Sequence, residues 1–239
     1  MSGVYISYPF CGRKCTYCNF DSELASVTLE QEYLRALQEE LSGWRWSWRP
    51  ETLYLGGGSP SRLDPTALEQ LLDAIPGRPW REATIEVVPG EVAPEKARAW
   101  VQMGLTRASV GAQSFVEQEL RVCGRTYTPE VVERDVEWLR AAGIKQVNID
   151  LIAGLPYQTP RSWETSLGWI ERLQPEHVSV YMLEVDEKSR LGRELLQGGS
   201  RYHAGAVPAE DVVVDLYGMA ASFLESIGIR QYEISNFAC

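Results

Sequence analysis

Short apolar runs typical of β-strands alternate along this chain with segments that have the periodicity of helices. The strand-like runs are 4–8, 52–55, 84–88, 108–111, 146–152 and 177–185. Strands that are separated by helical segments are joined by crossovers and lie parallel in one sheet. The alternation therefore predicts an α/β fold built on a parallel sheet.

Capping patterns indicate where the helices begin and end. Helix starts are predicted at Thr28, which has Gln31 three residues later, and at the pairs Asp64-Pro65, Thr128-Pro129 and Thr159-Pro160. Helix ends are predicted at Gly104, Gly143 and Gly228, each followed by an apolar residue. The last of these leads into a further strand at 231–234. We expect residues 1–200 to form the main domain and residues 201–239 to start a truncated C-terminal extension.

Three cysteines, Cys11, Cys15 and Cys18, occupy one short turn directly after the first strand-like run. Three thiolates are one ligand short of the closed tetrahedral site of structural zinc, whereas an iron-sulfur cubane can leave its fourth iron open. The two histidines, His177 and His203, lie far along the chain. Zinc completed by a distant residue is thus the weaker alternative, and the polar residues of the turn argue against free buried thiols.

Composition excludes several classes of protein. Five cysteines in 239 residues, with Cys123 and Cys239 as the other two, do not make a disulfide framework, and their clustering indicates a reducing compartment. We expect a cytoplasmic protein, because we see neither a signal peptide nor an apolar run long enough to cross a bilayer. The formal net charge of −10 argues against a nucleic-acid-binding surface.

Polar residues mark the carboxyl ends of the predicted strands. Glu86, Gln113, Asp150 and Glu184 occupy such positions, and the second strand ends in the glycine run 56–58. Ligands of parallel α/β proteins lie at these strand ends. We therefore expect one shared cavity, beside the cysteine turn, with glycines that allow backbone groups to approach a ligand closely.

Taken together, these motifs resemble the radical S-adenosylmethionine proteins of the HemN/HemW group. The similar stretches run in unchanged order through 5–6, 9–11, 15–18, 56–61, 85–86, 111–115, 124–126, 148–151, 154–156 and 232–238. The three-cysteine motif is common to the whole superfamily, whereas the combination is specific to this group.

The resemblance implies a partial (β/α)6 barrel with one [4Fe-4S] cluster on Cys11, Cys15 and Cys18. The amine and carboxylate of S-adenosylmethionine would then chelate the open iron. Residues implied to bind S-adenosylmethionine are Gly57, Gly58 and Ser59 at its methionyl part, with Tyr5, Tyr17, Glu86, Gln113, Arg125 and Asp150 lining the pocket. No catalytic residue is assigned.

Two functions within the group compete, a haem chaperone and an oxygen-independent coproporphyrinogen III oxidase. The early cysteine motif, Phe20 in place of the oxidase's further cysteine, and the stretch 232–238 favour the chaperone. Tyr127 replaces a histidine that is usual in the chaperones, and their haem motif would lie beyond residue 239, so a truncated inactive relative is the third reading. The implied partners are haem or porphyrinogen, an electron donor such as flavodoxin or ferredoxin, and respiratory haem proteins.

Overall fold

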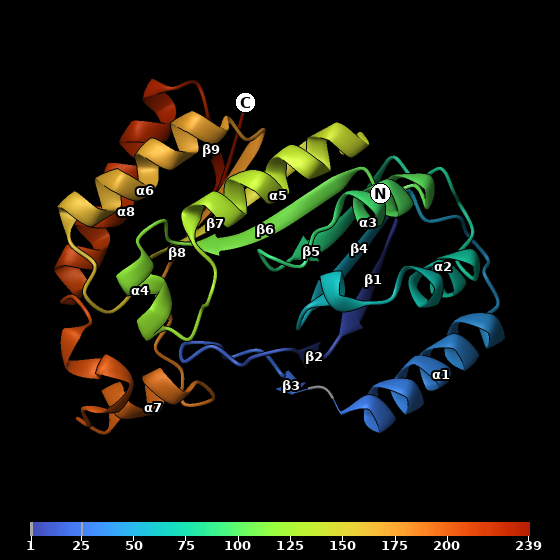
Figure 1. Ribbon diagram of the computed structural model, residues 1–239, viewed down its shortest axis with the longest axis horizontal. Helices are drawn as coiled ribbons and strands as arrows, with labels where there is room; N and C mark the ends of the chain where they lie inside the picture. Colours follow the sequence, from blue (N-terminus) through green and yellow to red (C-terminus); the bar gives the residue numbers. More distant parts are fainter. Residues whose placement is uncertain (1, 25) are drawn as a thin grey trace.

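The computed structural model describes residues 2–24 and 26–239 and shows one eight-stranded sheet (Figure 1). Six strands run parallel in sequence order; the seventh in the sheet pairs antiparallel with the sixth, and the eighth pairs antiparallel with the seventh. The parallel strands are β1 (Gly3–Tyr8), β4 (Thr52–Gly57), β5 (Glu82–Val87), β6 (Arg107–Gln113), β7 (Gln146–Ala153) and β8 (His177–Met182); β10 (Asn236–Ala238) and β9 (Arg230–Glu233) complete the order. This arrangement confirms the predicted α/β fold with six parallel strands.

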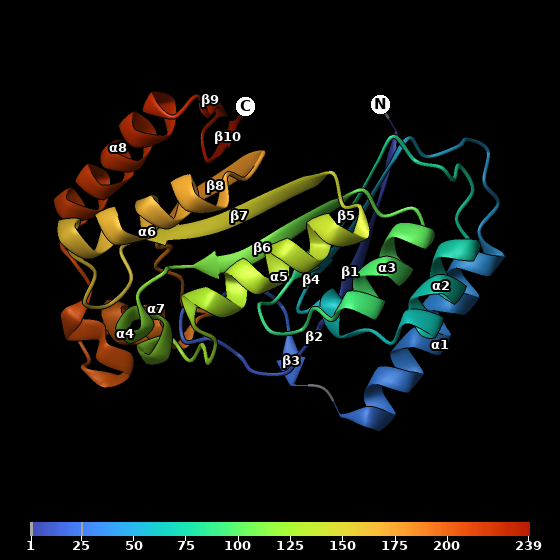
Figure 2. The ribbon, with the colours of Figure 1, turned by 45° about the horizontal axis from the view of Figure 1, so that its top comes forward.

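Helices fill the crossovers and cover one side of the sheet (Figure 2). The long helices are α1 (Val27–Gly43), α2 (Pro65–Asp73), α3 (Pro94–Gln102), α5 (Pro129–Ala142), α6 (Pro160–Leu173) and α8 (Glu210–Ser226), and α4 (Glu117–Val122) and α7 (Arg190–Leu196) are shorter. The core lies between helices and sheet, where strand residues such as Leu55 and Ile149 pack against Trp100 and Trp163.

Most capping predictions describe the observed helix ends. The Asp64 carboxylate accepts bonds from the first turn of α2, and Thr159 forms a capping box with Ser162 at the start of α6. The predicted start of α1 at Thr28 is wrong by two residues, because the Ser26 side chain accepts the N-cap bond from Leu29 N. Gly143 ends α5 in the left-handed conformation.

The polypeptide after β8 remains attached to the sheet. In α8, the Leu216 carbonyl accepts a hydrogen bond of 2.7 Å from the indole of Trp163 on α6, and β10 pairs with β8. The strand that the sequence predicts at 231–234 is β9, at 230–233. Among residues 2–24 and 26–239, no helix combines the length and apolar character needed to cross a membrane.

Candidate cofactor site

The cysteine loop, residues 9–21, begins where β1 ends. It is bound on one side by the glycine turn, residues 56–58, at the end of β4. Gly58 N donates to Tyr8 O at 2.7 Å, and Ser59 N donates to Phe10 O at 2.8 Å. The short strand β2 (Phe10–Cys11) also pairs with β3 (Glu23–Leu24), which closes the loop at its other end. Main-chain bonds therefore fix the start of the loop against the sheet.

Two further segments hold the middle of the loop. Thr16 N donates to Cys123 O, at the end of α4, over 3.1 Å, and Leu191 N, in α7, donates to Thr16 O over 2.8 Å. Figures 1 and 2 both show α4 and α7 beside this part of the chain. Beyond it, Asn19 donates to the Glu184 carboxylate at 2.7 Å, so the predicted polar residue after β8 also reaches the cysteine loop.

The three thiols form a donor set that fits a cluster. Cys11 and Cys15 are buried and Cys18 is partly exposed. Burial raises the pKa of Cys11, the Ser22 hydroxyl opposes this, and the thiols of Cys18 and Cys15 add to the increase. Within the described residues, no group of three or more His, Cys, Asp or Glu side chains is arranged to hold a single metal ion. Three nearby but separate thiolates suit a cubane, in which each cysteine binds a different iron.

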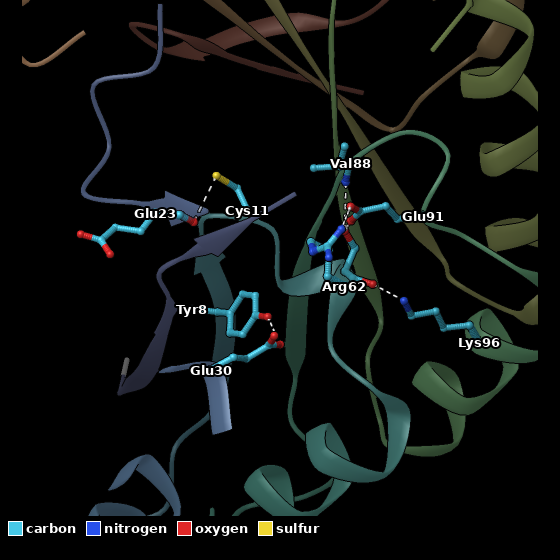
Figure 3. A network of polar contacts seen from close by, with 9 residues as sticks. Tyr8, Cys11, Glu23, Glu30, Arg62, Val88, Glu91 and Lys96 are labelled. Atoms are coloured by element: carbon cyan, nitrogen blue, oxygen red, sulfur yellow. Dashed lines mark hydrogen bonds and ion pairs between the residues drawn. The ribbon is translucent and has the colours of Figure 1, made fainter. Parts of the chain in front are cut away.

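Cys11 faces the segment that follows the loop (Figure 3). Its sulfur lies 3.5 Å from Glu23 O and 4.0 Å from Ser22 Oγ, while the Glu23 carboxylate points away. Because a thiol must lose its proton to bind metal, a raised pKa makes cluster binding dependent on proton release.

The glycine turn is packed tightly against the cysteine loop. A Cβ on Gly58 would contact Phe10 O and come within 2.7 Å of Phe10 C, and Gly57 has φ +113°. On the other side, a Cβ on Gly56 would lie 2.8 Å from Tyr5 Oη and 3.0 Å from Glu86 Oε1. We predicted that the glycines allow close approach of a ligand; at Gly58 the group that approaches is the backbone of Phe10.

A polar network anchors the residues that follow this turn (Figure 3). The buried hydroxyl of Ser61 donates to Glu91 and accepts from Val88 N at 3.1 Å, while Lys96 donates to Ser61 O. The neighbouring Arg62 lies 3.5 Å from the same Glu91 carboxylate. The segment that carries the predicted Ser59 is therefore held in place by the bonds of Ser61, two residues later.

Glu86 connects β5 to the glycine turn. One carboxylate oxygen accepts from Tyr54 Oη at 3.0 Å, and the other accepts from Gly57 N at 2.9 Å. Burial raises the pKa of Glu86 to about 7 despite these two bonds. Tyr5, which is 60% exposed, stacks on Tyr54 with the ring centroids 5.7 Å apart. This part of the sheet offers an aromatic surface next to a carboxylate that favours a cationic partner.

Asp150 belongs to a second network on the same sheet. Its carboxylate accepts from Asn148 Nδ2 at 2.7 Å and Ser109 Oγ at 3.3 Å, and burial raises its pKa. Asn148 also contacts His177 Nδ1 at 2.6 Å and Ser179 Oγ at 3.2 Å. Burial, with Arg107 as a smaller cause, lowers the pKa of His177 to about 4.

Sequence reasoning missed this network and assigned His177 no role. The strand register places Ser109 beside Asn148 and Asn148 beside His177, so the three side chains project from the same face of the sheet. The signal was the polar residue at every second position of these strands, which indicates a polar inner face.

Arg125 provides a positive charge beside Cys15. Its guanidinium donates to Tyr17 Oη at 2.9 and 3.1 Å and lies 5.8 Å from the centroid of the Tyr127 ring. Burial alone would lower the pKa of Arg125. The neighbouring Tyr17, Tyr127 and Cys15 together have a larger, opposite effect, so the net pKa is raised and the guanidinium stays charged. In the described part of the chain, Arg125 forms no ion pair with a carboxylate.

Gln113 ends β6 with an unusual backbone conformation. The pairing of β6 with β7 shifts between Val110 and Gln113, and Gln113 has φ 64°. Left-handed backbone is unfavourable for a residue with a side chain and is concentrated at functional sites. Tyr127 supports the bend, because its hydroxyl donates to the carbonyls of Gly111 and Ala112 at 2.8 and 2.9 Å.

The comparisons with known proteins agree with this architecture. Residues 5–170 match the Radical SAM superfamily. The chain belongs to the radical SAM superfamily. Membership implies a [4Fe-4S] cluster and S-adenosylmethionine as cofactors, and the cysteine loop and the polar sheet face of this radical SAM chain supply donors suited to both.

Individual relatives place the chain in the HemN/HemW group. It is 34% identical to the heme chaperone HemW of Bacillus subtilis, over all of this chain and 64% of that protein, and 30% identical to HemW of Escherichia coli, over 98% and 62%. The structure of the Escherichia coli coproporphyrinogen III oxidase HemN, a radical SAM enzyme, has a TM-score of 0.87 at 25% identity and covers 99% of this chain and 55% of that one. The chain thus spans less than two thirds of each.

Proposed function

We propose that this radical SAM chain is the cofactor-binding part of a HemW-like haem chaperone. The observation that carries the proposal is the cysteine loop, which main-chain bonds hold against a glycine turn that is itself bonded to Glu86. The similarity to HemW proteins over the whole chain favours haem as the compound that it handles.

In this proposal, Cys11, Cys15 and Cys18 hold three irons of the cluster and leave the fourth to S-adenosylmethionine. When bound, the cluster would supply the electron that cleaves the sulfonium of S-adenosylmethionine. The electron would come from a donor such as flavodoxin or ferredoxin.

The remaining predicted residues would bind S-adenosylmethionine. Glu86 suits the cationic amine, because a nearby cation would offset the burial that disfavours its charged form. Arg125, which has no carboxylate partner among the residues described, suits the carboxylate. The methionyl part would lie against Gly57, Gly58 and Ser59, and the walls of the pocket would be Tyr5, Tyr17, Gln113 and Asp150.

A coproporphyrinogen III oxidase is the second candidate function, because the HemN structure is so similar. A relative that binds a cluster without activity is the third. We also infer that the protein is cytoplasmic and that it acts on respiratory haem proteins. In the same proposal, the barrel ends near residue 200 and residues 201–239 begin an extension.

Anaerobic reconstitution tests the cofactor proposal. The wild-type chain should bind about four irons and four sulfides and change its absorption spectrum when S-adenosylmethionine is added. C11A should lose the cluster, whereas C239A, which removes an exposed thiol outside the loop, should keep it. A C11A variant with full iron content would refute the assignment.

Haem and porphyrinogen assays separate the candidate functions. A chaperone should bind haem and transfer it to a haem-free acceptor without consuming coproporphyrinogen III. Decarboxylation of coproporphyrinogen III would instead identify an oxidase. A loaded cluster with neither haem binding nor turnover would support the inactive relative.

A further inference from the structure

The first turn of α7 binds the cysteine loop on both sides of Cys15. Arg190 Nη2 donates to the carbonyl of Lys14, and Leu191 N donates to the carbonyl of Thr16 at 2.8 Å. The turn itself is well defined, since the buried Ser189 hydroxyl caps α7 by accepting from Gly192 N at 2.8 Å. The first turn of α7 is therefore attached to the loop by two hydrogen bonds, one from the Arg190 side chain and one from the Leu191 main chain.

Aromatic stacking orients the Arg190 side chain. Its guanidinium carbon lies 5.3 Å from the centroid of the Tyr202 ring, and the guanidinium carbon of Arg201 lies at the same distance. Tyr202 and His203 both have left-handed backbone, with φ 56° and 62°, and His203 Nδ1 is 3.1 Å from Tyr157 Oη. Two consecutive residues in this unfavourable conformation place the Tyr202 ring against the Arg190 guanidinium.

No carboxylate within residues 2–24 and 26–239 is paired with Arg190. Among the residues that the structure describes, no ion pair includes Arg190, and its Nε is buried without a hydrogen-bond partner. A partly buried cation is costly unless an anion is nearby. Three thiolates with a cluster would provide that anion on the loop whose backbone Arg190 binds, and reduction of the cluster would add a further negative charge there.

We propose that Arg190 is a positioning residue that holds the Cys15 segment and stabilises the reduced cluster with its fixed charge. This inference rests on the proposed function, because it requires the cluster on Cys11, Cys15 and Cys18. Arg190 contacts the backbone of the loop, and the inference predicts an effect on reduction potential that a purely structural contact would not produce.

Three variants test it: R190Q removes the charge but keeps a donor, R190K keeps the charge, and R193Q removes an exposed cation three residues further along α7. Iron content and the cluster's midpoint potential, from an EPR-monitored redox titration, are measured in each. R190Q should titrate at a more negative potential than the wild type, whereas R190K should remain near the wild-type value and R193Q should be unchanged.

Loss of iron from R190Q, with a native circular dichroism spectrum and full loading of R193Q, would also support the proposal that Arg190 holds the Cys15 segment. A fully loaded R190Q with wild-type potential would overturn the inference, as would an equal shift in R193Q. These outcomes are distinct from failure of the proposed function, in which the wild-type chain itself would bind no cluster.

Discussion

Replacing Gly58 by alanine should destabilise the cysteine loop more than any other single methyl addition to the glycine turn. The new Cβ would contact Phe10 O and lie within 2.7 Å of Phe10 C and 2.9 Å of Phe10 N, all of them backbone atoms. Since backbone cannot rotate away as a side chain can, the loop or the turn must shift.

The expected loss of unfolding free energy is several kcal/mol. Forcing an extra methyl group into a packed site costs about 1–3 kcal/mol. The shift would also weaken the bonds from Gly58 N to Tyr8 O and from Ser59 N to Phe10 O, which contribute about 0.5–1.5 kcal/mol each. Together these terms predict a loss of roughly 2–6 kcal/mol, with the upper value reached if both bonds are lost.

Urea denaturation of the cluster-free chain and iron analysis after reconstitution measure both effects. G168A is the matched control, because Gly168 lies within α6 and its added Cβ would point into open space. That variant should gain up to about 1 kcal/mol, since alanine favours helix over glycine. A G58A chain that unfolds at the wild-type urea concentration and binds four irons would refute the account of the turn.

Two further predictions concern the polar sheet face. The pKa of Glu86 is raised to about 7 in the folded state, so the folded protein binds a proton that the unfolded chain has lost, and the free energy of unfolding should fall as pH rises from about 4.5 to 7. In paired urea titrations, E86Q should remove about 2–3 kcal/mol of that fall. Identical pH profiles for the two proteins would contradict the burial of this carboxylate. N148A should lose about 2–4 kcal/mol, because it leaves Asp150 and His177 without their shared partner. N19A, which removes a solvent-exposed hydrogen bond to Glu184, should stay within about 0.5 kcal/mol of the wild type.

The strands and the cysteine loop could be predicted because their signals are local. Apolar runs of fixed spacing specify β4 or β7 within a few residues, and the spacing of three cysteines specifies a loop that can bind a cluster. The start of α1 shows the limit of this precision: Thr28 looks like an N-cap, yet Ser26, two residues earlier, takes that place.

The contacts that bring the site together could not be predicted, because they depend on strand register and on segments distant in sequence. The hydrogen bond of Asn148 with His177 requires knowing which residues of β7 and β8 are paired. Arg190 contacts Lys14 across 176 positions, through a helix that carries no motif. Gly58 could be recognised as part of a glycine run, but the reason for it, the backbone of Phe10, appears only in three dimensions.

The central claim is that Cys11, Cys15 and Cys18 hold a cluster with one iron free for S-adenosylmethionine. The most direct measurement is the EPR spectrum of the reduced, reconstituted chain before and after S-adenosylmethionine is added. We predict the signal of one [4Fe-4S] cluster whose g-values shift on addition, with the signal absent in C11A. A signal that S-adenosylmethionine leaves unchanged, or one that persists without Cys11, would contradict the account.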